Sequence, residues 1–528
     1  MPAVWLDVFL QSPSANCIRV SRSFRLLASD SQVWKEKYYE RWVLPRFLRT
    51  PGLRDAENIS LGLQYSSRRA RWLDDAHLVT PGRKTDWHKQ YRLKHNWNRG
   101  QCRTRRAEIG HRDEFRMLSQ IYGGFIFTAH AVHGIRVWET KEGPSVISSM
   151  PIDPPKPRDP HSPSEDGCRP SYPQSLSIDP LPSGAVNLVV GFNCGTFRVY
   201  KFTNDALTLE YDGKQGTRSC EEITMLGSYI LALSIPPFTD GELSLLRFPS
   251  DCHQPAQLPD PKPLMSAWGC NSWLPVSISL RSAAGGVIAA VTYFCNNILG
   301  PQLICIQEVR ITEDGEVEQS RLAFSAGLGR ESGSNLDAAD LIYSSLRDSS
   351  TKFVETRGSV VYSHPYLLAR LTDNTMIAYL VTSTPEKLEI GPGRRLWGHT
   401  SRVTSIRLND RGKAVSSTLC GEDIRLWDLE NILSAPDGRG RPSLCIRFPS
   451  YNPISCSYKQ LAYEDRMTFC EWIGFDNEQI VTLCVDIDYY YRESAFRYIM
   501  NDDSEYSWVK ISGTKPKSIG FWSCYDFT

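Results

Sequence analysis

The chain has 528 residues, of which 41% are hydrophobic and 23% charged, and its 60 basic residues nearly balance its 59 acidic ones. This composition excludes a wholly disordered chain, a collagen-like repeat and a coiled coil. The near-zero net charge gives no support to bulk attraction to nucleic acid or to a membrane surface. No apolar run reaches the length of about 18 residues that a membrane span needs, and the N-terminus lacks the pattern of a secretory signal. We therefore expect a soluble protein of the cytoplasm, the nucleus or both.

The first part of the chain, residues 1–110, carries helical signals. Apolar residues between Ile18 and Trp42 mostly recur at steps of three and four, and Ser29 and Asp30 interrupt them where a second short helix would begin. An amphipathic helix must bury its apolar face against something. Periodicity alone leaves two interpretations open, a small helical domain packed on itself and a helical module that binds a partner.

The residue pattern in this region is more specific. The run from Val20 to Asp30, followed by Val33-Trp34-Lys35, resembles the second half of an F-box at about a dozen positions of fixed spacing. Only Met1–Phe9 precede the position of Leu10, so we expect an F-box module over residues 1–48 with a shortened first helix. The resemblance implies binding to a Skp-type adaptor and, through it, to a cullin scaffold. The apolar side chains expected at the adaptor contact are Leu10, Ile18, Val20, Phe24, Leu27 and Trp34.

A basic segment follows, with nine Lys and Arg residues over 83–106 and interleaved aromatic residues at Trp87, Tyr91 and Trp97. Basic residues with aromatics are typical of nucleic-acid contacts. The alternative, which we favour, is a helix with one solvated basic face and one aromatic stripe. Residues 87–100 also resemble the helix that joins the F-box to the propeller in F-box/WD-repeat proteins. We therefore expect a helical linker over 49–105.

From residue 106 onward, short β-branched runs alternate with turn residues, as in a sandwich, a barrel or a propeller. An internal repeat decides among them. The stretch from Gly398-His399 to Trp427-Asp428 is a nearly complete WD repeat, and Gly110-His111 to Trp138-Glu139 is a second copy.

Weaker copies of this repeat raise the count to about seven blades. We expect an all-β, seven-bladed WD-repeat propeller over 106–528, with loop insertions near 151–173 and 327–351. With the N-terminal regions, the predicted fold is this propeller joined to a small all-α F-box module by a helical linker.

WD repeats share a structural network of a histidine, a serine or threonine, a tryptophan and usually an aspartate. By this resemblance the members here are His111, Thr128 and Trp138 in one repeat and His399, Ser417 and Trp427 in the other. The aspartate position falls on Val132 and on Gly421, which leaves Glu422 or Asp423 as substitutes in the second repeat. We expect these histidines to stabilise blade packing, because a satisfied buried polar network fixes a core.

No motif of an active site is present: the chain has no Walker loop, no dinucleotide-binding glycine pattern, no HExxH and no GxSxG. The fifteen cysteines include no Cys-x-x-Cys pair, which excludes paired zinc knuckles and thioredoxin-type centres. We therefore expect no enzyme activity, no catalytic residue, no metal and no cofactor.

Taken together, these segments resemble an F-box/WD-repeat protein. The resemblance implies the substrate-recognition subunit of an SCF-type cullin ubiquitin ligase, in which the propeller binds a protein substrate. Family members that bind phosphorylated substrates use arginines early in a blade's second strand, on the narrow face, and Arg116 and Arg402 match those positions. Whether the substrate is phosphorylated stays open. Two alternatives remain, a WD-repeat scaffold without ligase function and an RNA-associated propeller that uses residues 83–106, although we expect neither a nucleic-acid nor a membrane partner.

Overall fold

The computed structural model divides the chain into two compact units, residues Arg103–Asp526 and the remainder. We call the first the ring unit and the second the helical unit. The structure describes residues 30–43, 85–111, 117–152, 172–213, 219–234, 242–247, 256–257, 273–283, 285–295, 303–325, 359–384, 387–410, 412–418, 423–434, 444–447, 467–487 and 518–526.

The helical unit contains α3 (Ser31–Tyr38), the π-helical turn η2 (Tyr39–Val43) and α7 (Trp87–Arg99). Asp30 caps the N-terminus of α3, where its side chain accepts the Gln32 N–H. Asp86 does the same for α7, accepting the Lys89 N–H, and Gly100 ends that helix in the left-handed conformation with φ 65°. The helix starts predicted at Asp30 and near Trp87 are confirmed.

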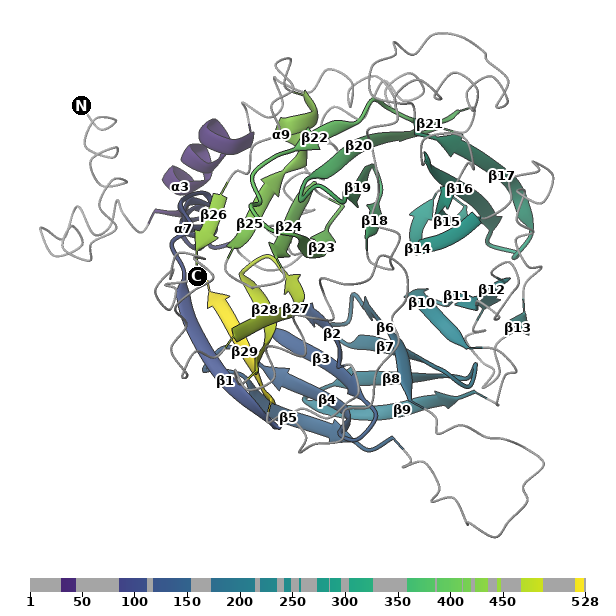
Figure 1. Cartoon of the computed structure of the whole chain (residues 1–528), viewed down its shortest axis with the longest axis horizontal. Helices are drawn as coiled ribbons and strands as arrows, with labels where there is room; N and C mark the ends of the chain where they lie inside the picture. The colour runs from purple at the N-terminus through teal and green to yellow at the C-terminus, as the bar shows by residue number, and fades with distance from the viewer. Residues whose placement is uncertain are drawn as a thin grey trace, which may run out of the picture. The chain divides into compact units, whose positions relative to one another are not determined.

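The ring unit consists of seven antiparallel sheets arranged as blades around one axis, as Figure 1 shows. The prediction of a seven-bladed propeller is confirmed. Blades 1 to 3 are β2 (Leu118–Tyr122), β3 (Phe125–His130), β4 (Gly134–Glu139) and β5 (Ser145–Met150); β6 (Pro173–Pro180), β7 (Val186–Phe192), β8 (Phe197–Thr203) and β9 (Ala206–Asp212); and β10 (Cys220–Leu226), β11 (Tyr229–Ser234), β12 (Glu242–Arg247) and β13 (Ala256–Gln257).

The later blades follow the same order along the chain, and blade 5 has its outer strand in two pieces, β21 and β22. Blades 4 to 6 are β14 (Trp273–Ala283), β15 (Gly286–Cys295), β16 (Leu303–Thr312) and β17 (Val317–Phe324); β18 (Val360–Ser363), β19 (Tyr366–Arg370), β20 (Met376–Ser383), β21 (Leu388–Ile390) and β22 (Arg394–Leu396); and β23 (Val403–Leu408), β24 (Lys413–Thr418), β25 (Asp423–Asp428) and β26 (Leu444–Arg447). A short helix, α9 (Leu429–Ser434), follows β25.

Blade 7 contains strands from both ends of the ring unit. Its strands β27 (Met467–Phe475), β28 (Gln479–Ile487) and β29 (Ser518–Asp526) pair in order, and β1 (Arg103–His111) adds to β29 as the fourth strand. The register runs from Arg103 opposite Asp526 to His111 opposite Ile519, with one bulge between Glu108 and Gly110. The first strand of the ring unit therefore closes the last blade, and β1 starts three residues before the predicted start of the propeller at 106.

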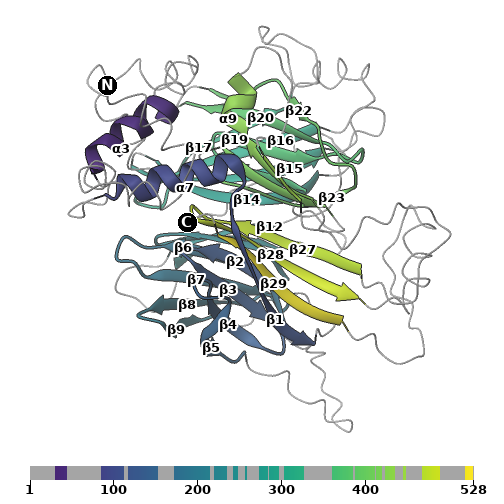
Figure 2. The ribbon, with the colours of Figure 1, turned by 90° about the vertical axis from the view of Figure 1, so that its left-hand side faces the viewer.

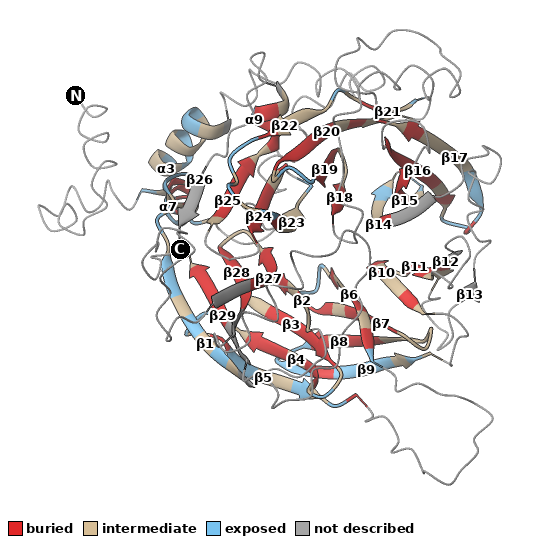
Figure 3. Cartoon of the chain, viewed as in Figure 1, coloured by how far each residue is buried: buried red, intermediate tan, exposed pale blue. Residues whose placement is uncertain are grey.

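The apolar core lies between neighbouring blades, and the middle strands are buried on both faces (Figure 3). All five residues of β19 are buried, as are six of the seven residues of β7. Such strands read as continuous apolar runs rather than as an alternation of apolar and polar residues. The predicted insertions near 151–173 and 327–351 lie almost entirely outside the described residues, and β6 already begins at Pro173.

Partly and fully buried carboxylates also join one blade to the next. Asp476, in the turn between β27 and β28, accepts the Gly124 N–H of blade 1 at 3.1 Å with Oδ2. Its Oδ1 accepts the N–H groups of Glu478 and Gln479 in its own turn, at 2.8 and 2.9 Å. Asp179 of blade 2 accepts the Gly227 N–H of blade 3 in the same way, at 2.7 Å. At two junctions, therefore, a carboxylate of one blade accepts a hydrogen bond from a backbone N–H in a turn of the neighbouring blade.

Asp476→Asn tests this link at the junction between the last blade and the first. The asparagine oxygen retains the two bonds within its own turn, but its amide nitrogen cannot accept the Gly124 N–H. We expect the free energy of unfolding to fall by about 1–3 kcal/mol, because a partly buried donor loses its partner. Urea unfolding of the full chain measures the change.

Asp373→Asn is the matched control. Asp373 also uses Oδ1 within its own turn, to Thr375, and its Oδ2 contacts Arg395 of the same blade at 3.1 Å. We expect a smaller loss for this variant. Equal losses would show that the contact between blades is not what Asp476 contributes.

Candidate functional site

Trp34, the predicted adaptor-contact residue that the structure describes, lies on α3 where this helix packs against α7 (Figure 2). Its ring centre lies 4.7 Å from that of His88 and 5.0 Å from that of Tyr91, both on α7. The Trp34 side chain is half-buried. It therefore packs the helical unit and still presents part of its surface. The other five predicted adaptor residues, Leu10, Ile18, Val20, Phe24 and Leu27, lie outside the described residues.

Further aromatic residues join the two helices around Trp34. Trp42 of η2 lies 4.6 Å from Tyr91 and 5.1 Å from Tyr38, measured between ring centres, and Tyr38 lies 5.7 Å from Trp87. Arg41 donates from Nη1 to the Tyr91 hydroxyl at 2.7 Å. Aromatic pairs in such tilted arrangements stabilise a core beyond their buried area. The regularly spaced aromatic residues of the sequence thus form the interior of this unit.

The part of the basic segment that the structure describes, residues 85–106, has charged side chains exposed and its aromatic rings buried. Trp87, Tyr91 and Trp97 are all buried, whereas Lys89 and Arg92 are exposed. Stacking of nucleic-acid bases requires exposed rings. The arrangement therefore favours the solvated helix face over the nucleic-acid contact.

A nearly complete WD-type network lies in blade 6. Trp427 Nε1 donates to Ser416 Oγ at 2.8 Å, and His399 Nε2 lies 2.7 Å from the same oxygen. On its other side, His399 Nδ1 lies 3.6 Å from Asp423 Oδ2, which accepts a bond of 2.6 Å from Arg425 Nε. The His399 side chain is 1% exposed. Asp423 is thus the carboxylate nearest to His399 in this repeat, which lacks the aspartate at its usual position, although the two side chains form no hydrogen bond.

The predicted serine of this network is wrong by one residue. Ser416 bonds His399 and Trp427, whereas the Oγ of Ser417 accepts a bond from the Cys470 thiol of blade 7 at 3.4 Å. Successive residues of a strand point to opposite faces of the sheet, so a shift of one residue exchanges the partners. The spacing from the histidine carries the signal: Ser416 follows His399 at the interval that separates Thr128 from His111.

Blade 1 has a shorter version of the network. Trp138 Nε1 donates to Thr128 Oγ1 at 3.1 Å, and that hydroxyl donates to the carbonyl of Arg136 at 3.2 Å. His111 is the last residue of β1, and the structure describes its backbone alone. Val132, at the aspartate position, lies in the turn after β3 and is 61% exposed.

Of the two predicted substrate-binding arginines, Arg116 lies outside the described residues. Arg402 is exposed and directly precedes β23, the first strand of blade 6. This corrects the prediction that places it in the second strand of a blade. The sequence repeat begins at His399, before the innermost strand of the blade. Arg402 therefore precedes the first strand, and the second strand starts only at Lys413.

Among the described residues, no group of three or more His, Cys, Asp or Glu side chains is placed to hold a metal ion. Within the same residues, no helix has the length and hydropathy of a membrane span. Cys470 and Cys484 lie directly opposite each other on β27 and β28 and are buried. The interaction with the neighbouring Cys484 thiol, together with burial, raises the pKa of Cys470 well above its ordinary value. A buried thiol of this kind is a poor nucleophile.

Ser416→Ala and Ser417→Ala form a matched pair that tests the network register. The first removes the acceptor of the buried Trp427 N–H and the partner of His399, so we expect the free energy of unfolding to fall by about 1–3 kcal/mol. The second removes only the acceptor of a weak thiol donor, and we expect a smaller loss. Chemical denaturation of the two variants measures the difference, and a larger loss for Ser417→Ala would contradict the assignment.

The stability of the ring unit is expected to depend on pH through His399. Burial, reinforced by the nearby Arg425 charge and opposed by Asp423, lowers the pKa of His399 below 6.5. Unfolding therefore takes up a proton between that lowered pKa and 6.5, so this contribution to stability is present above pH 6.5 and is lost as pH falls. We expect wild type to lose more stability than His399→Gln between about pH 7.5 and about pH 5.5 in urea titrations. Equal losses would contradict this role.

Comparison with known proteins gives one match of sequence and several of shape. The model of a family described as F-box protein pof12 beta-propeller matches residues 102–485, which include β1 to β27 and nearly all of β28. No curated protein sequence matches the chain. Similar solved structures include U3-55K (10% identity, TM-score 0.40, 80% of this chain and 98% of that chain), the WD40 β-propeller domain of Doa1 (10%, 0.33, 72% and 91%) and Kluyveromyces lactis Hsv2 (9%, 0.32, 65% and 85%).

Proposed function

Because this chain belongs to the F-box protein pof12 β-propeller family, we propose that it is the substrate-recognition subunit of an SCF-type cullin ubiquitin ligase. The family match over residues 102–485 is the observation that carries this proposal. The F-box-like residues Val20–Lys35, ahead of the matched region, support it independently.

In this proposal each unit has one binding task. The helical unit binds a Skp-type adaptor and thereby the cullin scaffold, and the ring unit binds a protein substrate. Holding the substrate near the ubiquitin-conjugating enzyme converts a bimolecular encounter into a positioned one, which accelerates transfer without any catalytic residue in this chain. The protein acts in the cytoplasm, the nucleus or both, and it makes and breaks no bonds itself.

The connection between the two units supports their joint action. Three residues, 100–102, separate the end of α7 from the start of β1. The helix that packs Trp34 therefore leads directly into the strand that closes the ring.

Arg402 is the proposed contact with substrate, since this residue is exposed and directly precedes β23. A guanidinium binds carboxylate and phosphate through two parallel hydrogen bonds. This chemistry suits an acidic segment of a protein substrate, and a phosphorylated residue would strengthen it.

Trp34→Ala in the full chain tests adaptor binding, with Trp42→Ala as the matched control. Both residues pack on Tyr91, at 5.0 and 4.6 Å between ring centres, so both changes weaken the interior of the helical unit. Only Trp34 belongs to the F-box-like pattern. We expect Trp34→Ala to weaken binding of purified Skp-type adaptor by about tenfold or more, measured by calorimetry, because buried aromatic anchors dominate such interfaces.

If wild type binds the adaptor and both variants weaken this binding equally, then Trp34 contributes to internal packing alone. No binding by wild type would overturn the ligase proposal and favour a WD-repeat scaffold.

A further inference from the structure

A buried carboxylate in blade 4 is surrounded by charged and polar groups. Glu308, on β16, has a side chain that is 1% exposed. Arg281 of β14 donates from Nη2 to both carboxylate oxygens at 2.9 Å, and Arg321 of β17 reaches Oε2 at 3.3 Å. Three of the four strands of blade 4 thus converge on one side chain.

The remaining partners of Glu308 come from blade 5. The Tyr362 hydroxyl of β18 donates to Oε1 at 2.9 Å, and the Ser383 hydroxyl of β20 donates to Oε2 at 2.5 Å. Burial, together with the Glu308 carboxylate, raises the pKa of Tyr362, so this hydroxyl stays protonated and acts as a donor. We call Glu308, Arg281, Arg321, Tyr362 and Ser383 the Glu308 cluster.

The two arginines also contact blade 5 directly. Arg281 Nη2 donates to Ser383 Oγ at 2.8 Å, and Arg321 Nη2 donates to the same oxygen at 3.1 Å. Arg321 Nη1 donates to the carbonyl of Thr384. Every charged member of the Glu308 cluster therefore spans the junction between the two blades.

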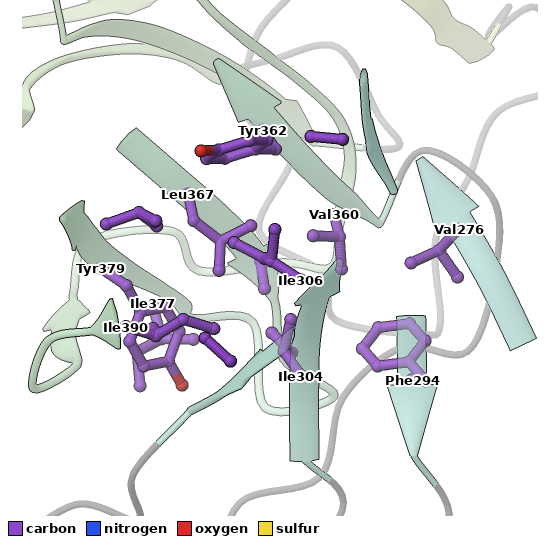
Figure 4. Packing of buried hydrophobic residues seen from close by; sticks show 14 of the residues in the cluster. Val276, Phe294, Ile304, Ile306, Val360, Tyr362, Leu367, Ile377, Tyr379 and Ile390 are labelled. Carbon is purple, nitrogen blue, oxygen red and sulfur yellow. The ribbon is translucent and has the colours of Figure 1, made fainter. Parts of the chain in front are cut away.

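An apolar core lies beside the Glu308 cluster at the same junction (Figure 4). Phe294, Ile304 and Ile306 of blade 4 belong to one buried group with Leu367 and Ile377 of blade 5. Tyr362 belongs to this core as well as to the polar cluster. The junction thus combines a packed apolar contact with a set of paired charges.

The chain that joins these two blades is long. Blade 4 ends at Phe324 and blade 5 begins at Val360, and the segment between them is rich in serine and aspartate. We propose that the Glu308 cluster clamps blade 4 to blade 5, so that the connection between them can be cut without opening the ring.

The energetics of buried charges explain why Glu308 is central. Arg281 and Arg321 are 25% and 13% exposed, and the carboxylate is the group that compensates both guanidinium charges. Removal of one partner from such a set leaves buried charge without compensation, which costs far more than the loss of a surface pair. The clamp therefore fails as a unit when Glu308 loses its charge.

The experiment inserts a site for a sequence-specific protease between Gly333 and Ser334 of the full chain. Hydrogen exchange, followed by mass spectrometry, is measured in β16 and β18 before and after cutting. We expect no rise on cutting wild type, and a rise of about tenfold or more on cutting Glu308→Gln. Glu318→Gln is the matched control, because Glu318 of the same blade forms an exposed ion pair with Arg310 at 3.0 Å.

A rise in β18 exchange on cutting wild type would overturn the proposal, as would unchanged exchange on cutting Glu308→Gln. If Glu308→Gln fails to fold before cutting, Tyr362→Phe takes its place, since it removes only one hydroxyl from the clamp. Cut Tyr362→Phe must then exchange faster in β18 than cut wild type for the proposal to stand. These readouts are independent of adaptor and substrate binding.

Discussion

The antiparallel pairing of β1 with β29 is the constraint on which the ring depends, because it brings the first and last strands of the ring unit into one sheet. Each blade alone is a sheet of four strands, or five in blade 5, with apolar faces, and it becomes stable only between two neighbours. Closing the ring gives the first and last blades a second neighbour. It thereby buries the blade faces that would stay exposed at the two ends of an open row of blades. Because α7 leads into β1 after three residues, the closing strand is also the point at which the helical unit joins.

Polar groups at the blade junctions also help each blade to pack against its neighbours. Asp476 satisfies a backbone donor of blade 1, Ser416 satisfies the indole of Trp427, and Glu308 compensates two arginines from its own blade while it binds blade 5. A buried polar group is costly unless it is paired. These side chains therefore specify which blades meet and in which register, whereas the apolar clusters supply most of the driving force.

The sequence was informative where one local rule dominates. Asp30 reveals a helix start because capping is local, and the Gly-His and Trp-Asp pairs reveal blades because their spacing is fixed. The sequence pattern predicts Ser417 for the network, whereas the structure shows Ser416, because neighbouring strand residues differ only in the face to which they point. The Glu308 cluster could not be predicted, since its members come from five strands of two blades and follow no periodic pattern. Arg402 was placed in the wrong strand because the motif starts before the innermost strand.

We propose that one chain holds an adaptor with its helical unit and a protein substrate with its ring unit. Affinity purification of the full chain from cells that express it, with captured proteins identified by mass spectrometry, tests both halves at once when wild type is compared with Trp34→Ala. We expect wild type to capture a Skp-type adaptor, a cullin and further proteins, and the variant to lose the first two while it retains the others. Retention of adaptor and cullin by the variant, or their absence from wild type, would contradict it.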